Sequence, residues 1–444
     1  MSSEQSELKA ARIDALTLQL ASLTGATDGA EPLAFWVPGR IEVLGKHTDY
    51  GGGRSLLCAV ERGICVVATA RNDAATDARS QLAVRVLDAN SGEAAEFELS
   101  ADVETRPGHW SNYPTTVARR IAANFSGTMW GADIVFASDL PHAAGVSSSS
   151  ALVVACFLAL SAVNDLPARP EYRDNIFTKE DLAGYLGCVE NGLDFKSLHG
   201  HVGVGTFGGS EDQTAILCAI PNSLVQYSFC PVTFERTIAI PGGYSFVIGA
   251  SGVLAEKTGA ALQLYNGVSR RLSTALEIWN RASGRSDSSM SEAISSAPDA
   301  AARIRDALGA ATDADYAPES LLQRFDQFYV ESNELIPNAG DALASGDLTA
   351  FGEIVARSQA GAERALHNQI PQTVALVEQA HELGAVAASA FGAGFGGSVW
   401  ALVSSGDAES FRNRWSRSYH QQFPETSGRS EFFSTIAGPP ATRL

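Results

Sequence analysis

PGRIEVLGKHTDYGGG, residues 38–53, gathers charged and polar side chains around a turn that is rich in glycine. Gly45 followed by Lys46 resembles a phosphate-binding P-loop, but that loop requires the spacing G-x-x-x-x-G-K-[ST]. Arg40 stands where the first glycine of the loop should be, and His47 follows the lysine. Lys46 is therefore not a P-loop lysine, and the stretch needs another explanation.

A second stretch, LPHAAGVSSSSAL (residues 140–152), puts a glycine and four serines directly before an apolar run, residues 151–163. This run predicts a buried helix, because it is shorter than the ~20 residues that cross a bilayer. The first turn of a helix has unpaired N–H groups and partial positive charge, which together favour bound phosphate. One helix cap needs only one serine. Four serines therefore favour a phosphate cradle over a simple cap.

A third stretch, FGAGFGG (residues 391–397), has the spacing G-x-G-x-x-G of a dinucleotide-binding fingerprint. A fingerprint of that kind is followed by a helix. Here SVWALV follows, residues 398–403, and it alternates like a strand. The stretch instead predicts a tight bend, whose small residues would let the backbone approach the phosphate cradle closely.

The chain has 444 residues, a formal net charge of −18 and 45% hydrophobic residues. This length predicts two domains. The negative charge argues against nucleic acid or a membrane as a partner, because both require basic surface. The N-terminal segment predicts an amphipathic helix and not a secretory signal. The six cysteines lack metal-ligand spacing and are typical of reduced thiols, so we expect a cytoplasmic protein.

The pattern of apolar residues places most strands in the first half of the chain and most helices in the second. We therefore expect domains at residues 1–235 and 236–444. The pattern also predicts the secondary structure of three shorter segments. DQTAILCAI (212–220) is predicted as a strand, SLLCAVERGICVVATARN (55–72) as a pair of strands, and the serine-rich residues 283–298 as a surface loop.

In their order and separation, the three glycine-rich stretches resemble the three motifs of the GHMP small-molecule kinases. The first is similar to the galactokinase motif GRxNLxGEHTDYxxG. Four shorter pieces support the resemblance, namely WSNY (Trp110–Tyr113), CVEN (Cys188–Asn191), SEDQTAIL (Ser210–Leu217) and YNGVSRR (Tyr265–Arg271). The resemblance covers residues 35–403.

The resemblance implies an α+β, two-domain GHMP kinase fold. In that fold an N-terminal α/β domain with a left-handed βαβ crossover meets a ferredoxin-like C-terminal domain, and the active site lies between them. It further implies transfer of the γ-phosphoryl group of ATP to the anomeric hydroxyl of a sugar. ATP and Mg²⁺ are the implied cofactors.

Two residues are implied to be catalytic. Asp212, in EDQ where the family has MDQ, would take or orient the proton of the sugar hydroxyl. Arg40 would keep Asp212 ionised and reach the transferring phosphate. Without the resemblance, Asp212 would be interpreted as a turn or cap residue, and Arg40 as one partner of a structural ion pair.

The remaining implied residues bind ATP, the metal ion or the sugar. The implied ATP-binding residues are Gly145, Ser147, Ser148, Ser149 and Trp110. The implied Mg²⁺ ligands are Ser148 and Glu190, whose hard oxygen atoms suit this ion. The implied sugar-binding residues are Lys46, His47, Asp49, Gly209 and Tyr265.

Lys46 departs from the family, which has glutamate there, and Glu42 stands where the family has asparagine. By analogy the family glutamate accepts a hydrogen bond from the 6-hydroxyl of the sugar, which an ammonium group cannot do. In one account Lys46 pairs with a carboxylate such as Glu42 and the substrate remains galactose. In the other it faces a charged group at C6, as in a uronic acid.

Two rival functions remain at this stage. One is a galactokinase-like sugar sensor that binds ATP and sugar without turnover. Such a protein is expected to lose part of the serine loop or the base, and both are present in this chain. The other is a GHMP kinase that acts on a different substrate. The sequence leaves the oligomeric state open.

Overall fold

The computed structural model describes residues 3–24, 32–71, 81–141, 145–254, 259–312 and 315–444. Its strands form two sheets, of which the first is built mostly from the N-terminal half of the chain. The strands of this first sheet are β1 (Leu33–Leu44), β2 (Arg54–Ala70), β3 (Ala83–Asp88), β4 (Ala94–Glu98), β5 (Ala132–Ser138), β6 (Ser223–Ser228), β7 (Thr233–Ala239) and β12 (Thr442–Arg443).

The first sheet has the order β12-β1-β2-β5-β3-β4, with β6 paired to β2 and β7 to β6. Strands β3 and β5 run parallel, while the other pairs recorded in this sheet are antiparallel. Strand β2 is one long strand whose two ends pair with different neighbours. The predicted pair of strands at residues 55–72 is therefore wrong, because no turn residue interrupts the extended backbone there.

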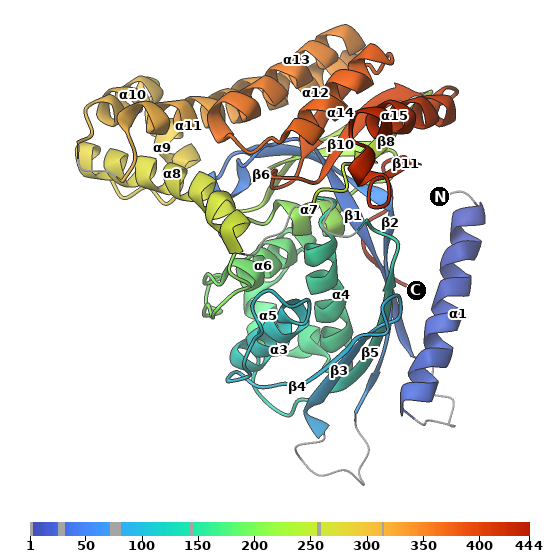
Figure 1. Cartoon of the computed structure of the whole chain (residues 1–444). Helices are drawn as coiled ribbons and strands as arrows, with labels where there is room; N and C mark the ends of the chain where they lie inside the picture. Colours follow the sequence, from blue (N-terminus) through green and yellow to red (C-terminus); the bar gives the residue numbers. More distant parts are fainter. Residues whose placement is uncertain (1–2, 25–31, 72–80, 142–144, 255–258, 313–314) are drawn as a thin grey trace.

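Both faces of the first sheet are covered by helices. Side chains alternate along the strands, so that Trp36 and Val67 face helix α1 (Ser3–Thr24), whereas Val37 and Val66 face the main core. On the main-core side lie α3 (Asn112–Asn124), α4 (Ser148–Val163), α5 (Pro170–Asn175), α6 (Lys179–Asn191) and α7 (Glu211–Cys218). Figure 1 shows α1 alone on the outer face and α4 under the opposite face.

The second sheet is antiparallel and consists of β8 (Tyr244–Ala250), β9 (Ala387–Phe391), β10 (Ser398–Ser404) and β11 (Glu431–Thr435). Its order is β11-β8-β10-β9. Helices join β8 to β9 and β10 to β11, which gives the βαββαβ connectivity of a ferredoxin-like unit. Helices α14 (Pro371–Glu382) and α15 (Ala408–Gln422) pack on this sheet. The expected mixed fold is confirmed, while the boundary near residue 236 stays a prediction.

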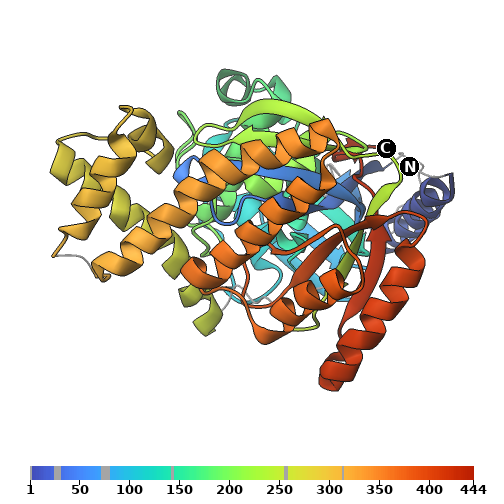
Figure 2. The same ribbon diagram turned by 90° about the horizontal axis from the view of Figure 1, so that it is seen from above.

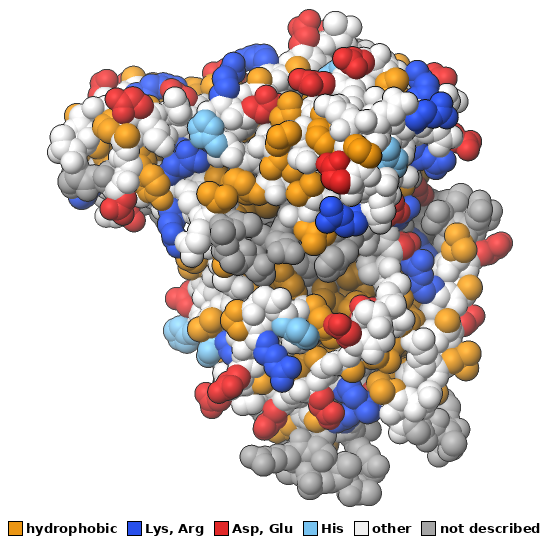
Figure 3. All heavy atoms as spheres, in the orientation of Figure 1, with side chains coloured by type: hydrophobic (Ala, Val, Ile, Leu, Met, Phe, Trp, Pro, Cys, Tyr) orange, Lys and Arg blue, Asp and Glu red, His pale blue; other side chains and the backbone are white. Residues whose placement is uncertain are grey.

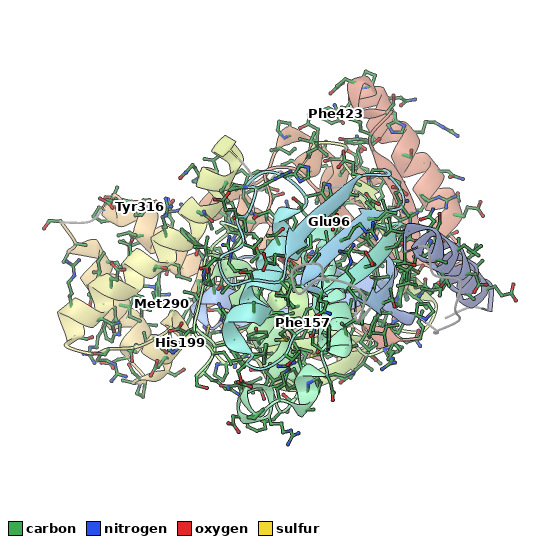
Figure 4. The ribbon with its side chains drawn as sticks, turned by 90° about the horizontal axis from the view of Figure 1, so that it is seen from below. Glu96, Phe157, His199, Met290, Tyr316 and Phe423 are labelled. Atoms are coloured by element: carbon green, nitrogen blue, oxygen red, sulfur yellow. The ribbon has the colours of Figure 1, made fainter. Side chains whose placement is uncertain are left out.

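The connection from β8 to β9 forms a helical arm with its own apolar core. The helices of this arm are α8 (Gly259–Ser283), α9 (Met290–Ser295), α10 (Ala300–Gly309) and α11 (Pro318–Val330). Seen from above, the arm projects from one side of the molecule (Figure 2). Figure 4 shows Met290 and Tyr316 out in this arm, whereas Phe157 of α4 lies near the middle of the molecule.

Helix α11 continues through a π-helical turn, Glu331–Leu335, into α12 (Ile336–Ser345). The chain then forms α13 (Leu348–Gly361) and a second π-helical turn, Ala362–Leu366. A π turn inserts an extra residue into a helix and is frequent at functional sites. The first of these turns holds part of the site described below.

Two further local predictions are wrong. DQTAILCAI belongs largely to helix α7, because a short apolar run has no periodicity that separates a strand from a buried helix. The serine-rich residues 283–298 contain helix α9, which Ser289 caps by accepting a hydrogen bond from the backbone N–H of Glu292. Within the described residues, no helix has the length and apolarity to cross a membrane.

Candidate active site

A cavity of about 840 Å³ opens between the start of α4, the turn after β1 and the glycine-rich bend after β9. The face drawn in Figure 3 is hollowed at mid-height, between the upper and lower parts of the molecule. Twelve of the thirteen residues predicted for the site line the cavity. They are Arg40, His47, Asp49, Trp110, Gly145, Ser147, Ser148, Ser149, Glu190, Gly209, Asp212 and Tyr265. Lys46, the thirteenth, is not among the lining residues.

The serine loop has the backbone shape that exposes the first turn of α4. Gly145 and Ser147 both adopt positive φ angles, 77° and 60°, immediately before the helix begins at Ser148. The hydroxyl of Ser147 is buried, and no hydrogen-bond partner for it lies within the described part of the chain. Since α4 has no side-chain cap, its first N–H groups remain available to an anion.

The glycine-rich bend contacts this loop directly. A Cβ atom on Gly392 would lie 2.9 Å from the carbonyl oxygen of Gly145, and one on Gly145 would lie 3.1 Å from that of Phe391. Only glycine permits so close an approach of two backbones. The predicted close approach of the third stretch to the serine loop is therefore confirmed, while phosphate binding by that loop stays a prediction.

Arg40 and Asp212 form the polar centre of the cavity. The Nε of Arg40 donates to Oδ1 of Asp212 at 2.8 Å, and its Nη2 lies 2.7 Å from the same oxygen. Its Nη1 donates to the carbonyl oxygen of Gly145 at 2.6 Å. Burial alone would lower the pKa of Arg40, but Asp212 and Glu211 outweigh it and raise that pKa. The guanidinium therefore joins the predicted base to the serine loop.

Ser150 links the same loop to two carboxylates, although the sequence gives no signal that separates it from the other serines. Its hydroxyl contacts Oε2 of Glu190 at 2.9 Å and Oδ2 of Asp212 at 3.1 Å. Gln213 also donates to Oε2 of Glu190, at 2.7 Å. The repeated serines gave a signal for the loop as a whole, but only the turn of the helix decides which hydroxyl faces inward.

Glu190 fits the chemistry expected of a magnesium ligand. Its carboxylate is buried and lines the cavity beside the serine loop. Among the described residues, no three His, Cys, Asp or Glu side chains converge on one point. In nucleotide sites Mg²⁺ takes one or two protein oxygens, and substrate phosphates and water complete its shell. The roles of Glu190 and Ser148 as ligands stay predictions.

Asp49 and Gly209 meet on the opposite wall of the cavity. Oδ2 of Asp49 accepts a hydrogen bond from the backbone N–H of Glu211, at 3.2 Å, and so caps α7. Burial raises the pKa of Asp49, while this backbone hydrogen bond opposes the shift. Each oxygen of a carboxylate has two lone pairs, so Oδ1 of Asp49 can accept a hydrogen bond from a sugar hydroxyl.

Gly209→Ala is expected to raise KM for the sugar about tenfold or more and to leave KM for ATP within about twofold. The reason is steric, since the new Cβ would lie 2.4 Å from Oδ2 of Asp49 and 2.9 Å from the backbone nitrogen of Tyr50. Steady-state kinetics in each substrate measures the effect. Gly242→Ala is the matched control, because its Cβ would meet no atom within 4 Å. Equal changes in both KM values would contradict the expectation.

His47 lines the cavity, yet both of its ring nitrogens have protein partners. Nε2 lies 3.2 Å from the carbonyl oxygen of Ala393, and Nδ1 lies 3.2 Å from the hydroxyl of Tyr50. Burial, followed by the nearby Arg324, lowers the pKa of His47 to about 3, so the ring is neutral. A neutral ring with Nε2 protonated satisfies both contacts. Its predicted hydrogen bond to sugar would have to replace one of them.

Lys46 points away from the cavity wall. Its Nζ donates to the carbonyl oxygen of Ala390, at the end of β9, and the side chain is buried. None of the ion pairs recorded within the described residues includes Lys46, although its charge lowers the pKa of Glu42. The predicted close pairing of Lys46 with Glu42 is therefore not seen, and direct contact of Lys46 with sugar stays a prediction.

Three residues from the second half of the chain hold the turn at residues 45–47. Oε1 of Glu331 accepts from the backbone N–H of Gly45 at 3.0 Å. Gln327 donates to the carbonyl oxygen of Lys46 at 3.1 Å, and Arg324 donates to that of His47 at 2.6 Å. These residues have no local sequence signal, because they lie about 280 positions away from the turn.

Tyr265 and Trp110 both line the cavity and have different aromatic neighbours. Tyr265 is close to His47, with ring centroids 5.6 Å apart, which places it with the other predicted sugar residues. Trp110 packs near Phe136, at 6.0 Å, on the side of the first sheet. The indole N–H of Trp110 is buried, and none of the described residues accepts a hydrogen bond from it. Their roles in binding sugar and adenine stay predictions.

Comparison with known families accounts for these features together. The GHMP kinase N-terminal domain matches residues 112–217, the GHMP kinase C-terminal region matches 341–421, and the galactokinase galactose-binding signature matches 26–70. The chain belongs to the GHMP kinase superfamily. Within that superfamily it is galactokinase-like, as the sequence predicted.

Individual relatives agree with this assignment. A galactokinase of Roseiflexus sp. (strain RS-1) is 28% identical over 393 residues, which are 88% of each chain. A galactokinase of Actinobacillus pleuropneumoniae serotype 5b (strain L20) is 25% identical over 87% of this chain and 89% of the relative. The Lactococcus lactis galactokinase, solved with galactose, has a similar fold with a TM-score of 0.76 and 22% identity, covering 97% of this chain and 100% of that one.

Proposed function

We propose that the protein transfers the γ-phosphoryl group of ATP to the anomeric hydroxyl of galactose or of a closely related sugar. The observation that supports this best is the contact at 3.1 Å between Ser150, in the first turn of α4, and Asp212. This contact brings together the first turn of α4, where a phosphate chain can bind, and the carboxylate of Asp212, which can accept the hydrogen of a sugar hydroxyl. A donor and an acceptor bound on either side would therefore be close enough to react.

The residues act mainly by positioning and by balancing charge, as phosphoryl transfer requires. Asp212 orients the acceptor hydroxyl and takes its proton. Arg40 keeps Asp212 in place and neutralises charge on the transferring group, since its planar fork reaches both Asp212 and the carbonyl oxygen of Gly145. The first N–H groups of α4 hold the phosphate chain.

Mg²⁺, when bound with ATP, would neutralise charge on the phosphate oxygens. Glu190 and Ser148 are the residues proposed to hold it, and both line the cavity. Ser150 and Gln213 fix the carboxylate of Glu190 by donating to one of its oxygens. These two contacts hold the carboxylate in place beside the serine loop, as residues around a metal ligand commonly do.

The identity of the sugar can be tested by ADP release coupled to a dehydrogenase. We expect turnover with galactose, and a kcat/KM for galacturonate that is at least about tenfold lower, because the ammonium group of Lys46 is bonded to Ala390 and not directed into the cavity. Comparable kcat/KM values for the two sugars would contradict the galactose assignment and favour a uronic acid kinase. Sugar binding by calorimetry without ADP release would instead favour the sensor.

A further inference from the structure

Glu42 lies on strand β1, two residues after Arg40, and its side chain lines the same cavity. It is 3% exposed. Its Oε2 accepts a hydrogen bond from the backbone N–H of Gly392, at 3.2 Å, in the glycine-rich bend. Its Oε1 is buried and has no hydrogen-bond partner among the residues that the structure describes. One acceptor atom on the cavity wall is therefore left for a group from outside the chain.

No cation among the described residues forms a hydrogen bond with this oxygen. Lys46 is close enough to stabilise the charge on Glu42, but its ammonium group donates to the carbonyl oxygen of Ala390. The guanidinium of Arg40 is engaged by Asp212 and by the carbonyl oxygen of Gly145. Leaving a buried acceptor unpaired costs free energy in the empty protein. Such a cost is found at sites where a ligand later provides the missing partner.

The described lining, Glu42 included, is acidic. It contains seven carboxyl groups and one permanent cation, Arg40. The seven are Glu42, Asp49, Asp88, Glu93, Glu190, Glu211 and Asp212. Those of the seven that are ionised would repel a carboxylate on the acceptor sugar. A neutral hydroxyl, in contrast, can donate its hydrogen to a carboxylate in a charge-assisted bond.

We infer that Glu42 binds the acceptor sugar, with Oε1 accepting a hydrogen bond from one of its hydroxyl groups, and that it restricts the acceptor to uncharged sugars. This inference rests on the proposed function only for the class of ligand, a sugar. Lys46 is then a positioning residue, which holds its charge near Glu42 and leaves the carboxylate free for the ligand. The carboxylate that binds the sugar is thus that of Glu42 on β1, and Lys46 follows it four residues later in the turn.

Calorimetry tests the inference without depending on catalysis. Galactose and five analogues, each lacking one of its hydroxyls, are titrated into the wild type and Glu42→Met in the absence of ATP. In the wild type we expect one analogue to bind about 10- to 100-fold more weakly than galactose. In Glu42→Met that gap should shrink to within about threefold, because the acceptor is missing. An equal loss of affinity for all six sugars in the variant would overturn the inference.

Glu42→Gln keeps the shape of the side chain and removes only the charge. We expect the preference of the wild type for galactose over galacturonate to shrink at least about fivefold in this variant. Asp133→Asn is the matched control, since Asp133 is also a buried carboxylate but pairs with Arg71 and Arg85 outside the cavity. It should leave the preference unchanged. An unchanged preference in Glu42→Gln would overturn the charge-selection part of the inference.

Stability separates a ligand-binding role from a structural one. Burial raises the pKa of Glu42 to about 7, opposed by Lys46 and Arg40 and reinforced by Glu331. The folded protein therefore gains a proton here that the unfolded chain lacks between about pH 4.5 and 7. The stability that this proton provides is lost as the pH rises through that window.

Glu42→Gln should accordingly raise the melting temperature at pH 8 relative to the wild type, and by more than it does at pH 5. A structural carboxylate would give the opposite sign, with the variant less stable at pH 8. Failure of the ADP-release assay with every sugar would remove the proposed kinase function. The calorimetric test of Glu42 does not depend on that assay, because it measures sugar binding without turnover.

Discussion

Replacing Asp212 with asparagine is expected to lower kcat by about 10²- to 10⁴-fold, the usual contribution of a positioned general base. The amide oxygen can still accept the two hydrogen bonds of Arg40, at 2.8 Å and 2.7 Å in the wild type, so the cavity should keep its shape. An amide cannot take the proton of the sugar hydroxyl. Coupled ADP release measures kcat, and calorimetry measures galactose affinity, which should stay within about threefold.

The control for Asp212→Asn is Asp133→Asn, which removes a buried carboxylate that pairs with Arg71 and Arg85. This control should retain nearly all of the wild-type kcat. If Asp212→Asn kept more than about a fifth of that kcat, Asp212 would not be the base. The proposed mechanism would then need another proton acceptor in the cavity.

Arg40→Met is expected to reduce both catalysis and stability. The side chain of Arg40 is 4% exposed, and its guanidinium lies within 4.0 Å of the carboxylates of Asp212 and Glu211. Removing one member of such a buried group costs about 3–5 kcal/mol of stability near neutral pH. Losing a cation that stabilises the transferring phosphoryl group lowers kcat by about 10³-fold. Urea unfolding and coupled ADP release measure the two losses.

The stability loss in Arg40→Met should depend on pH in a defined direction. Burial already raises the pKa of Glu42 to about 7 and that of Glu211 well above its usual value, and Arg40 opposes both shifts. Without Arg40 these carboxyls hold their protons to still higher pH. The folded variant therefore regains stability as the pH falls below neutral, and its deficit at pH 5 should be smaller than at pH 8.

Arg40→Lys distinguishes charge from geometry. Lysine restores a cation, but it lacks the fork that reaches both Asp212 and the carbonyl oxygen of Gly145. We expect Arg40→Lys to recover much of the stability and little of the kcat. Full recovery of kcat would mean that Arg40 acts as a point charge and does not orient Asp212.

The sequence predicted the parts of the site that are local in the chain. A run of serines before an apolar helix gives a helix start with free N–H groups, and this local rule led to Ser148 at the beginning of α4. Two glycine-rich segments imply backbones in close approach, which Gly145 and Gly392 show. Periodicity failed at DQTAILCAI, where tertiary packing makes a short apolar segment a helix.

The rest of the site depends on contacts between distant residues. Glu331 and Arg324 hold the turn at residues 45–47 from a helix that follows some 280 positions later. The direction of Lys46 is set by the end of β9, where the carbonyl oxygen of Ala390 accepts its hydrogen bond. A pattern along the chain carries no information on which of two buried groups will meet. The sequence therefore predicts Lys46 as a sugar contact, while the structure shows Glu42 lining the cavity.

Strand β12 has a consequence for how the molecule is made. Residues 442–443 pair with Phe35 and Trp36 of β1, and the N–H of Gly438 donates to the carbonyl oxygen of Ala59. At about 5–20 residues per second, a ribosome needs roughly 20–80 seconds to travel from the first of these partners to the last. During that interval the edge of β1 has no neighbour on one side. The nascent chain therefore carries an open sheet edge, a site for mispairing, through most of its synthesis.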